Sequence, residues 1–411
     1  MLPLPYVRLD SPERNCANAG RAEAWRFPPN TPEWVVTCDA PDHAFLHTSD
    51  GVEQQWDDPL EALGWMVEHA MLQNNARVRW VGYFSYDLGR LFERLPSRAA
   101  DDLNLPLFRF SLQYRVGDVP HDLLYSPAPT SDALRSTFTR DAYLAAVGRA
   151  IEYIAAGDVF QVNLSQRFTV PLREHPAKLY ARLRRQSPAW YGACLCYEDF
   201  AILSNSPELF LRVEPTDPHT GKRRVVTRPI KGTRPRLPGM NDELLASGKD
   251  AAELNMIVDL ERNDLGRVCE VGSVKVAEPR SIEAHPSVYH GVATIEGVLR
   301  DDVTLVDLLR ATFPGGSVTG APKIRAMEII DELEPVRRGP YCGAIGYIGG
   351  DGAAEFNVAI RTMTVKDRLV YVPVGGGIVA DSDPAAEYEE TLVKARAMFA
   401  ALGVGPEHLP R

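Results

Sequence analysis

The 411-residue sequence lacks several features that would assign it to a special class of protein. It has no run of about 18 apolar residues, so no segment is predicted to cross a membrane. Its N-terminal residues include no apolar core long enough for a signal peptide. The six cysteines form neither a CxxC pair nor a zinc-ligand spacing. These absences together predict a cytoplasmic protein with reduced thiols.

Positive charge is also scarce, because 45 Lys and Arg face 55 Asp and Glu and the formal net charge is −10. This balance argues against a nucleic-acid binder, which normally has a basic surface. It argues equally against binding to an anionic membrane. A local basic site for an anionic substrate stays open. The remaining composition, 45% hydrophobic and 24% charged, is ordinary for a soluble globular protein.

The order of the expected elements predicts an α+β fold with antiparallel sheets. A helix is expected from Thr139, as its cap, to Gly157, and alternating residues 160–165 should form the next strand. Two strands should flank a turn at 214–221, and residues 341–374 read as strands broken by the hairpin signal at 349–352.

The ends of the chain add two expectations. A last helix should open with Asp383 as its cap and Pro384 at its first position. The linker-like stretch 126–132 predicts a boundary between an N-terminal lobe, 1–130, and a catalytic domain, 131–411.

One candidate site is a pair of segments around Glu208 and Lys231. If the turn closes symmetrically at 219–220, these two side chains lie opposite each other and face one space. The positive charges of Arg228 and Arg234 would then lower the pKa of the Lys231 amine and free its lone pair. The alternative is a surface cross-strand salt bridge, which contributes little to stability.

A second candidate is a set of carboxylates on two expected helices, Glu253 on one and Glu387 with Glu390 on the other. Residues 387 and 390 are one helical turn apart and share a face. Carboxylates that converge from two helices suit Mg²⁺. The alternative is that they are simply solvated.

Glycines and isolated basic residues complete the candidates. Glycine-rich stretches at 374–378 and 313–323 could bind an anion through bare backbone N–H groups, or could form turns that need positive φ. Arg361, expected on a mostly apolar strand, should find a carboxylate in a substrate or in the protein itself. His290 is a lone histidine and could equally be a satisfied core residue.

Taken together, these segments resemble the chorismate-utilising enzymes over roughly residues 140–402. The stretches that carry the resemblance are Ser206-Pro-Glu208, Pro229-Ile-Lys-Gly-Thr233, Ala252-Glu-Leu-Asn-Met-Ile-Val-Asp-Leu-Glu-Arg-Asn-Asp-Leu-Gly266, Gly320-Ala-Pro-Lys323, Gly343-Ala-Ile-Gly-Tyr347, Ala359-Ile-Arg-Thr362 and Gly376-Gly-Ile-Val-Ala-Asp-Ser382. The resemblance implies two antiparallel sheets packed as a sandwich and flanked by helices.

Two positions indicate a branch of this family. Lys231 stands where anthranilate synthases typically carry alanine and aminodeoxychorismate synthases carry lysine. Gln161 stands where isochorismate-forming members carry a water-activating lysine. The stretch 86–96 also looks like the aminodeoxychorismate branch, which aminates C4 of chorismate on the way to 4-aminobenzoate and folate. The alternatives are anthranilate synthase component I and a non-catalytic scaffold for an amidotransferase.

The resemblance also implies a role for each candidate residue. Lys231 would be the nucleophile at C2 of chorismate, and Glu208 the acid that protonates the departing hydroxyl. Glu253 and Glu390 would hold Mg²⁺, with Glu387 nearby. The substrate-binding residues would be Arg361, Tyr347, the amides of Gly375, Gly376 and Gly377, His290, Thr319 and Lys323. Ammonia would come from a separate glutamine amidotransferase subunit, since the chain has no Gly-x-Cys-x-Gly nucleophile motif.

Overall fold

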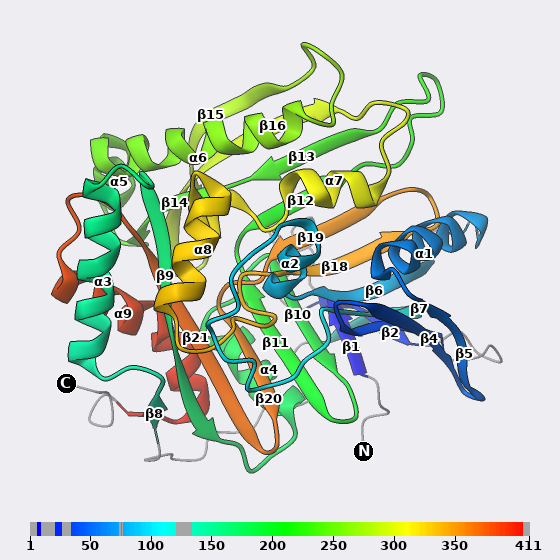
Figure 1. Cartoon of the computed structure of the whole chain (residues 1–411), viewed down its shortest axis with the longest axis horizontal. Coiled ribbons are helices and arrows are strands. Elements are labelled where there is room, and N and C mark those ends of the chain that lie inside the picture. Colours follow the sequence, from blue (N-terminus) through cyan, green and yellow to red (C-terminus); the bar gives the residue numbers. More distant parts are fainter. Residues whose placement is uncertain are drawn as a thin grey trace.

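A computed structural model describes residues 6–9, 21–26, 34–73, 75, 77–120 and 134–405 of the chain (Figure 1). The expected lobe boundary at 126–132 lies outside these ranges. The division into 1–130 and 131–411 therefore stays a prediction.

The helices begin and end close to their sequence signals. Their bounds are α1 Pro59–Gln73, α2 Gly89–Phe92, α3 Arg140–Ala155, α4 Pro176–Gln186, α5 Met240–Ala246, α6 Gly248–Gly266, α7 Leu305–Thr312, α8 Lys323–Leu333 and α9 Pro384–Leu402, with short 3₁₀ turns η2 Tyr86–Leu88 and η4 Gly316–Val318. Thr139 caps α3 by accepting a hydrogen bond from the Ala142 amide, and Asp383 caps α9 in the same way. The two caps predicted from sequence are confirmed.

The strands are mostly joined as hairpins. Their bounds are β1 Tyr6–Leu9, β2 Arg21–Arg26, β3 Val35–Ala40, β4 His43–Thr48, β5 Gly51–Trp56, β6 Val78–Phe84, β7 Phe108–Pro120, β8 Arg135–Ser136, β9 Gln161–Pro171, β10 Tyr191–Cys196, β11 Phe200–Ser206, β12 Leu209–Val213, β13 Arg224–Arg228, β14 Ile230–Pro235, β15 Lys275–Ala284, β16 Val288–Val298, β17 Gly320–Ala321, β18 Ala344–Gly349, β19 Ala354–Val358, β20 Thr362–Lys366 and β21 Leu369–Ile378. The predicted hairpins β12–β13 and β18–β19 are both present.

The strands form two antiparallel sheets that meet at the long strand β7. One sheet runs β9–β21–β20–β11–β10–β1–β2. The other runs β7–β6–β18–β19–β12–β13–β16–β15. The first half of β7 pairs with β6 and its second half with β2, so it connects the two sheets. The predicted α+β class with two antiparallel sheets and flanking helices is confirmed.

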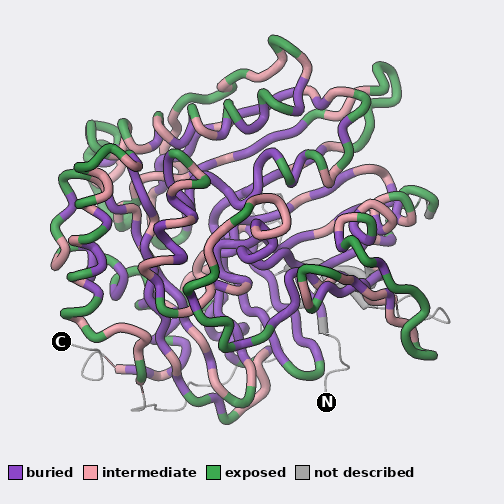
Figure 2. The backbone as a smooth tube through the Cα atoms, in the orientation of Figure 1, coloured by how far each residue is buried: buried purple, intermediate pink, exposed green. Residues whose placement is uncertain are grey.

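The core lies between the sheets and under the helices, where the backbone is mostly buried (Figure 2). Aromatic side chains such as Phe84, Phe110 and Phe356 pack together in its centre. Helices α3, α4 and α9 pack together, and α9 also contacts β21, while α6 covers β14, β15 and β16. No helix in the described part of the chain is long and apolar enough to cross a membrane. The cysteines that the structure describes are buried free thiols.

Candidate active site

The predicted nucleophile and acid both come from the second sheet, in which β14 follows β13 along the chain and pairs with β16. Lys231 lies on β14, and Glu208 lies just before β12. Gly377, on β21 of the first sheet, lies close to Lys231, because a Cβ atom added to Gly377 would stand 3.5 Å from the Lys231 Nζ atom. The site therefore lies where an end of β21 meets β14, with α6 and α9 beside it.

The register between β12 and β13 differs from the symmetric closure that the sequence suggested. Leu209 pairs with Arg228, and a bulge between Leu209 and Arg212 shifts the ladder. Glu208 is thus not directly opposite Lys231. Lys231 lies on β14, outside the ladder between β12 and β13. The prediction of direct opposition is wrong. The two groups nevertheless interact, since each affects the charge of the other.

Glu208 is a buried carboxyl whose pKa is raised toward neutrality. It is 4% exposed, and burial raises the pKa of its carboxyl to about 7. The Ser317 hydroxyl and the Ile230 backbone lie close enough to oppose the effect of burial. The Lys231 and Arg361 charges oppose it as well. A buried acid with a pKa near neutrality is suited to proton transfer.

The Lys231 amine also has a perturbed environment, but not for the predicted reason. Burial lowers the pKa of the amine, and the Lys394 charge lowers it as well, against the opposing effects of Glu253 and Glu208. Arg228 and Arg234 are paired elsewhere: Arg228 with Glu283, and Arg234 with Glu243 and Asp250. Burial, rather than those two arginines, is therefore the main cause of the lowered pKa.

Basic and polar groups line the side of the site that faces Glu208. Arg361 lies in the turn between β19 and β20, with φ of 49°, so the prediction that it lies on a strand is wrong. Burial lowers the pKa of its guanidinium, and the Glu208 charge opposes that effect. His290 is 1% exposed, and its Nδ1 atom lies 2.9 Å from the Thr233 hydroxyl. Burial first, and then the Arg361 charge, hold the pKa of His290 well below its usual value.

The three glycines belong to strand β21. Gly375, Gly376 and Gly377 pair with Ser165, Leu164 and Asn163 of β9. Because glycine has no side chain, these residues leave space in the site. A Cβ atom on Gly377 would stand 2.9 Å from the Gln161 amide nitrogen, so a side chain there would fill the space beside Lys231. Gln161 itself is fully buried, and its amide has no hydrogen-bond partner among the described residues.

The carboxylates predicted to hold a metal lie near the backbone of the three glycines. A Cβ atom on Gly376 would lie 3.1 Å from Glu387 Oε2 and 3.6 Å from Glu390 Oε1. Glu253 approaches from α6, near enough to affect the Lys231 charge. Glu390 forms a 2.7 Å ion pair with Lys394, whose ammonium outweighs the effect of burial and lowers the pKa of Glu390. Carboxylate oxygens are the donors that Mg²⁺ prefers, so the chemistry of the set fits this ion.

The spacing of these groups is looser than that of a preformed metal site. In the described ranges, no three His, Cys, Asp or Glu side chains are grouped closely enough to hold one ion. The Glu387 Oε1 atom accepts a 2.7 Å hydrogen bond from the Ser382 hydroxyl. The Mg²⁺ ligand set of Glu253, Glu387 and Glu390 therefore stays a prediction.

A comparison with protein-family models shows the family of this chain. Residues 113–400 match the model of the chorismate binding enzymes, well over half of the chain. The chain belongs to this family. The match includes the strands and helices that carry Glu208, Lys231, Glu253 and Arg361.

Individual relatives of this chorismate-binding enzyme carry two different names. It is 42% identical to anthranilate synthase component 1 of Thermus thermophilus over 401 residues, which cover 87% of this chain and 85% of the relative. It is 40% identical to aminodeoxychorismate synthase component 1 of Escherichia coli over 375 residues, covering 82% and 81%. The structure of anthranilate synthase component I from Streptococcus pneumoniae aligns with a TM-score of 0.76 at 28% identity, covering 97% and 93%. The reaction of this chorismate-binding enzyme is thus not fixed by similarity.

Three of the predicted substrate-binding residues have other contacts in the structure. The Thr319 hydroxyl donates to the Gly315 carbonyl at 3.0 Å, and Lys323 forms a 2.6 Å ion pair with Asp264. The Tyr347 ring lies 3.8 Å from the Arg79 guanidinium and packs in a separate apolar cluster. Their roles in binding substrate stay predictions.

Sequence reasoning missed three residues of this site. Lys394 pairs with Glu390 and donates to the Gly375 carbonyl at 2.9 Å. Ser317 lies beside Glu208, and Glu261 is a second buried carboxyl near it. Helical spacing offered a signal for Glu261, because residues 253, 257 and 261 are four apart and share a face.

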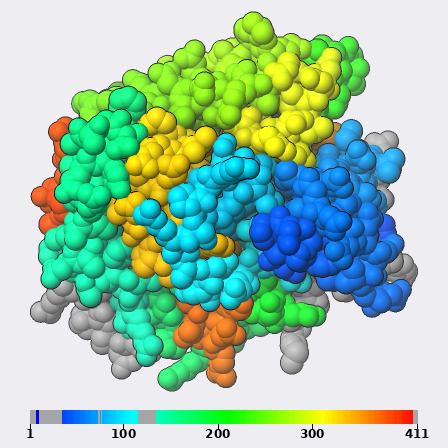
Figure 3. All heavy atoms as spheres, in the orientation of Figure 1, coloured from blue at the N-terminus to red at the C-terminus, as the bar shows by residue number. Residues whose placement is uncertain are grey.

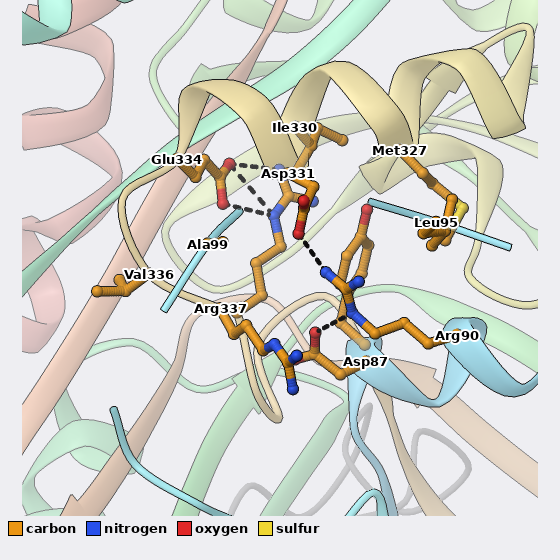
Figure 4. Close-up of a pocket in the computed structure, with 12 residues that line it drawn as sticks. Asp87, Arg90, Leu95, Ala99, Met327, Ile330, Asp331, Glu334, Val336 and Arg337 are labelled. Carbon is orange, nitrogen blue, oxygen red and sulfur yellow. Dashed lines mark hydrogen bonds and ion pairs between the residues drawn. The ribbon is translucent and has the colours of Figure 1, made fainter. Parts of the chain in front are cut away.

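A separate small pocket is lined by residues of the segment after β6 and of α8. These two segments, cyan and orange-yellow, lie side by side on the surface in Figure 3. Figure 4 shows that ion pairs fill much of the pocket, with Arg90 held between Asp87 and Asp331. Behind them, Arg338 pairs with Glu334 at 2.7 Å and donates to the carbonyls of Val318 and Asn163. These contacts fix η4 and β9, which bear Ser317 and Gln161.

Proposed function

We propose that the protein converts chorismate and ammonia to 4-amino-4-deoxychorismate, as an aminodeoxychorismate synthase component I. One observation carries the proposal. The Lys231 amine, whose pKa is lowered by burial, lies in the same site as the Glu208 carboxyl, whose pKa is raised by burial to about 7. Both shifts favour the neutral amine and the protonated acid that C4 amination through an enzyme adduct requires.

The proposed chemistry has two halves. In the first, the Lys231 lone pair forms a bond to C2, the ring double bonds shift, and the C4–oxygen bond breaks. Glu208 gives its proton to that oxygen, which leaves as water. In the second, ammonia forms a bond to C4, the double bonds shift back, and the C2–nitrogen bond breaks to release the Lys231 amine. The new C4 ammonium then returns a proton to Glu208.

The remaining groups would bind and orient the substrate. Chorismate is a dianion, and the Arg361 guanidinium is positioned beside Glu208 to pair with a carboxylate. The neutral His290 and the glycine strand leave room for the ring. Glu253, Glu387 and Glu390 would hold Mg²⁺, which when bound supplies positive charge for the ring carboxylate.

Ammonia would come from a glutamine amidotransferase subunit. The relatives named component 1 support this part of the proposal, because the name implies a second component. Function in the cytoplasm, and in 4-aminobenzoate and folate synthesis, belongs to the same proposal.

Product analysis tests the reaction. Purified protein is incubated with chorismate, Mg²⁺ and ammonium, with and without an added aminodeoxychorismate lyase. The proposal predicts 4-aminobenzoate in the presence of the lyase and no anthranilate fluorescence without it. Anthranilate formed by the protein alone would contradict the proposal.

The second candidate is anthranilate synthase component I, and the name of the Thermus thermophilus relative favours it. In that reaction nitrogen is added at C2, where the Lys231 amine would compete with ammonia. The same product assay separates the two. A scaffold without activity would give neither product, although the proposed catalytic groups Glu208 and Lys231 are both present.

A further inference from the structure

Two of the carboxylates predicted to hold Mg²⁺ face an ammonium group of the protein itself. Glu390 forms its 2.7 Å ion pair with Lys394, one turn further along α9. The Lys249 Nζ atom lies 3.9 Å from Glu253 Oε1, one turn before it on α6. The proposed chemistry assigns no role to either lysine. Each lies four residues from a predicted metal ligand, on the same helix face, so its effect on metal binding needs an explanation.

Lys394 differs from an ordinary surface lysine in how it is held. An exposed ion pair between residues four apart on a helix contributes little to stability, and both side chains of the Lys394–Glu390 pair are partly exposed. Lys394 Nζ, however, also donates a 2.9 Å hydrogen bond to the Gly375 carbonyl of β21. The ammonium thus joins helix α9 to the glycine strand, and two different elements fix its position.

This ammonium lies among the predicted metal ligands. A Cβ atom on Gly376 would stand 3.7 Å from Lys394 Nζ. The same point is 3.1 Å from Glu387 Oε2 and 3.6 Å from Glu390 Oε1. All three charged atoms are therefore within 4 Å of one point beside β21. At such short range the ammonium offsets part of the repulsion between the two carboxylates.

A metal ion at Glu390 would meet the same ammonium. Mg²⁺ binds carboxylate oxygens at about 2.0–2.1 Å, so an ion on Glu390 Oε1 would lie within about 5 Å of Lys394 Nζ if the 2.7 Å ion pair stayed intact. Two cations this close repel each other. The flexible four-carbon stem of lysine allows the ammonium to move away. The ion pair and the metal are therefore alternatives at one carboxylate.

We propose that Lys394 is a built-in competitor of Mg²⁺: its ammonium neutralises Glu390 when no metal is bound, and Mg²⁺ displaces it from that carboxylate on binding. The ammonium stays protonated throughout, so the step exchanges one cation for another. The competition keeps the affinity of the protein for Mg²⁺ lower than the carboxylates alone would give. The proposal rests on the part of the proposed function that places Mg²⁺ at Glu390.

Binding of Mn²⁺, a spectroscopic substitute for Mg²⁺, tests the proposal without turnover. Metal-depleted protein is titrated with Mn²⁺ in the absence of chorismate, free Mn²⁺ is followed by its EPR signal, and Mg²⁺ is then added to displace the bound Mn²⁺. Lys394→Gln removes the charge and should lower the dissociation constants of both ions by about five- to tenfold. Lys394→Arg keeps the charge and should stay within about two-fold of wild type. If Lys394→Gln binds the ions no more tightly than wild type, the proposal is overturned.

Two further variants separate local competition from other effects. Arg396→Gln removes the same charge from an exposed position on α9 and should leave the Mn²⁺ affinity within about two-fold of wild type. Equal tightening by Arg396→Gln and Lys394→Gln would assign the effect to the overall charge and overturn the proposal. Glu390→Gln should weaken Mn²⁺ binding, because a predicted ligand is lost.

The Glu390→Gln result also shows which claim has failed. If this variant binds Mn²⁺ like wild type, the magnesium part of the proposed function fails together with the competition at Glu390. If Glu390→Gln weakens binding and Lys394→Gln does not tighten it, only the competition is overturned.

Thermal unfolding gives an independent readout. With the metal removed by EDTA, Lys394→Gln should be less stable than wild type, because Glu387 and Glu390 lose the ammonium between them. A fixed excess of Mg²⁺ should raise the Tm of Lys394→Gln more than that of wild type, since a tighter ligand stabilises the folded state more at the same concentration. Equal increases in the two proteins would contradict the exchange, whichever product they form.

Discussion

The Lys231 amine lies 3.5 Å from the point that a Cβ atom on Gly377 would occupy. The same point is 2.9 Å from the Gln161 amide, so the space beside the proposed nucleophile exists because residue 377 has no side chain. Gly377→Ala should therefore displace Lys231 and lower kcat/KM by about 100-fold. Gly148→Ala, on α3 with nothing within 4 Å, is the control. Equal activity of the two variants would show that this space is not where chorismate reacts.

The pH dependence of activity should follow Lys231 and Glu208. Glu208 must be protonated, and its pKa is about 7, so kcat/KM should fall as the pH rises above 7. Lys231 must be neutral, and its lowered pKa places the acid limb below the usual range of lysine. Glu208→Gln should lower kcat by about 100- to 10,000-fold and remove the alkaline limb from the residual rate. An intact alkaline limb in that variant would assign the acid role to another group.

The Mg²⁺ dependence of activity should change when Glu390 is substituted and stay the same when its neighbour Glu389 is substituted. Glu390→Gln should raise the Mg²⁺ concentration needed for half-maximal activity by about 10- to 100-fold, because a ligand charge is lost. Glu389 is exposed on the same helix, and Glu389→Gln should leave the Mg²⁺ titration unchanged. If Glu390→Gln titrates like wild type, this carboxylate is not a ligand.

The buried Arg338–Glu334 pair should contribute strongly to stability. Both side chains are at most 4% exposed, and Arg338→Met would leave the Glu334 charge buried without its partner. Urea unfolding should show a loss of about 3–5 kcal/mol. Arg98→Met breaks the more exposed pair with Glu332 and should cost under about 1 kcal/mol. Similar losses for the two variants would contradict this role of burial.

Local signals in the sequence were enough to predict several elements of the fold. The caps Thr139 and Asp383 act through hydrogen bonds to residues three positions later, so their helices could be placed without knowing the tertiary structure. The turn residues at 349–352 likewise place the β18–β19 hairpin. The two-sheet arrangement came from the family resemblance.

Contacts between distant segments were not predictable in the same way. The bulge after Leu209 shifted the register of β12–β13, and no local pattern indicated it. Arg228 pairs with Glu283, 55 residues away, so its effect on Lys231 could not be judged from sequence. The burial of Glu261 depends on how α6 packs on the second sheet, which only the assembled fold determines.

The most direct test of the proposed mechanism is mass spectrometry of the protein quenched with chorismate and Mg²⁺ in the absence of ammonia. The mechanism predicts an adduct with the mass of chorismate less water on the peptide that contains Lys231, and its loss when ammonium is added. An unmodified peptide, together with wild-type formation of 4-amino-4-deoxychorismate by Lys231→Ala, would contradict the covalent mechanism.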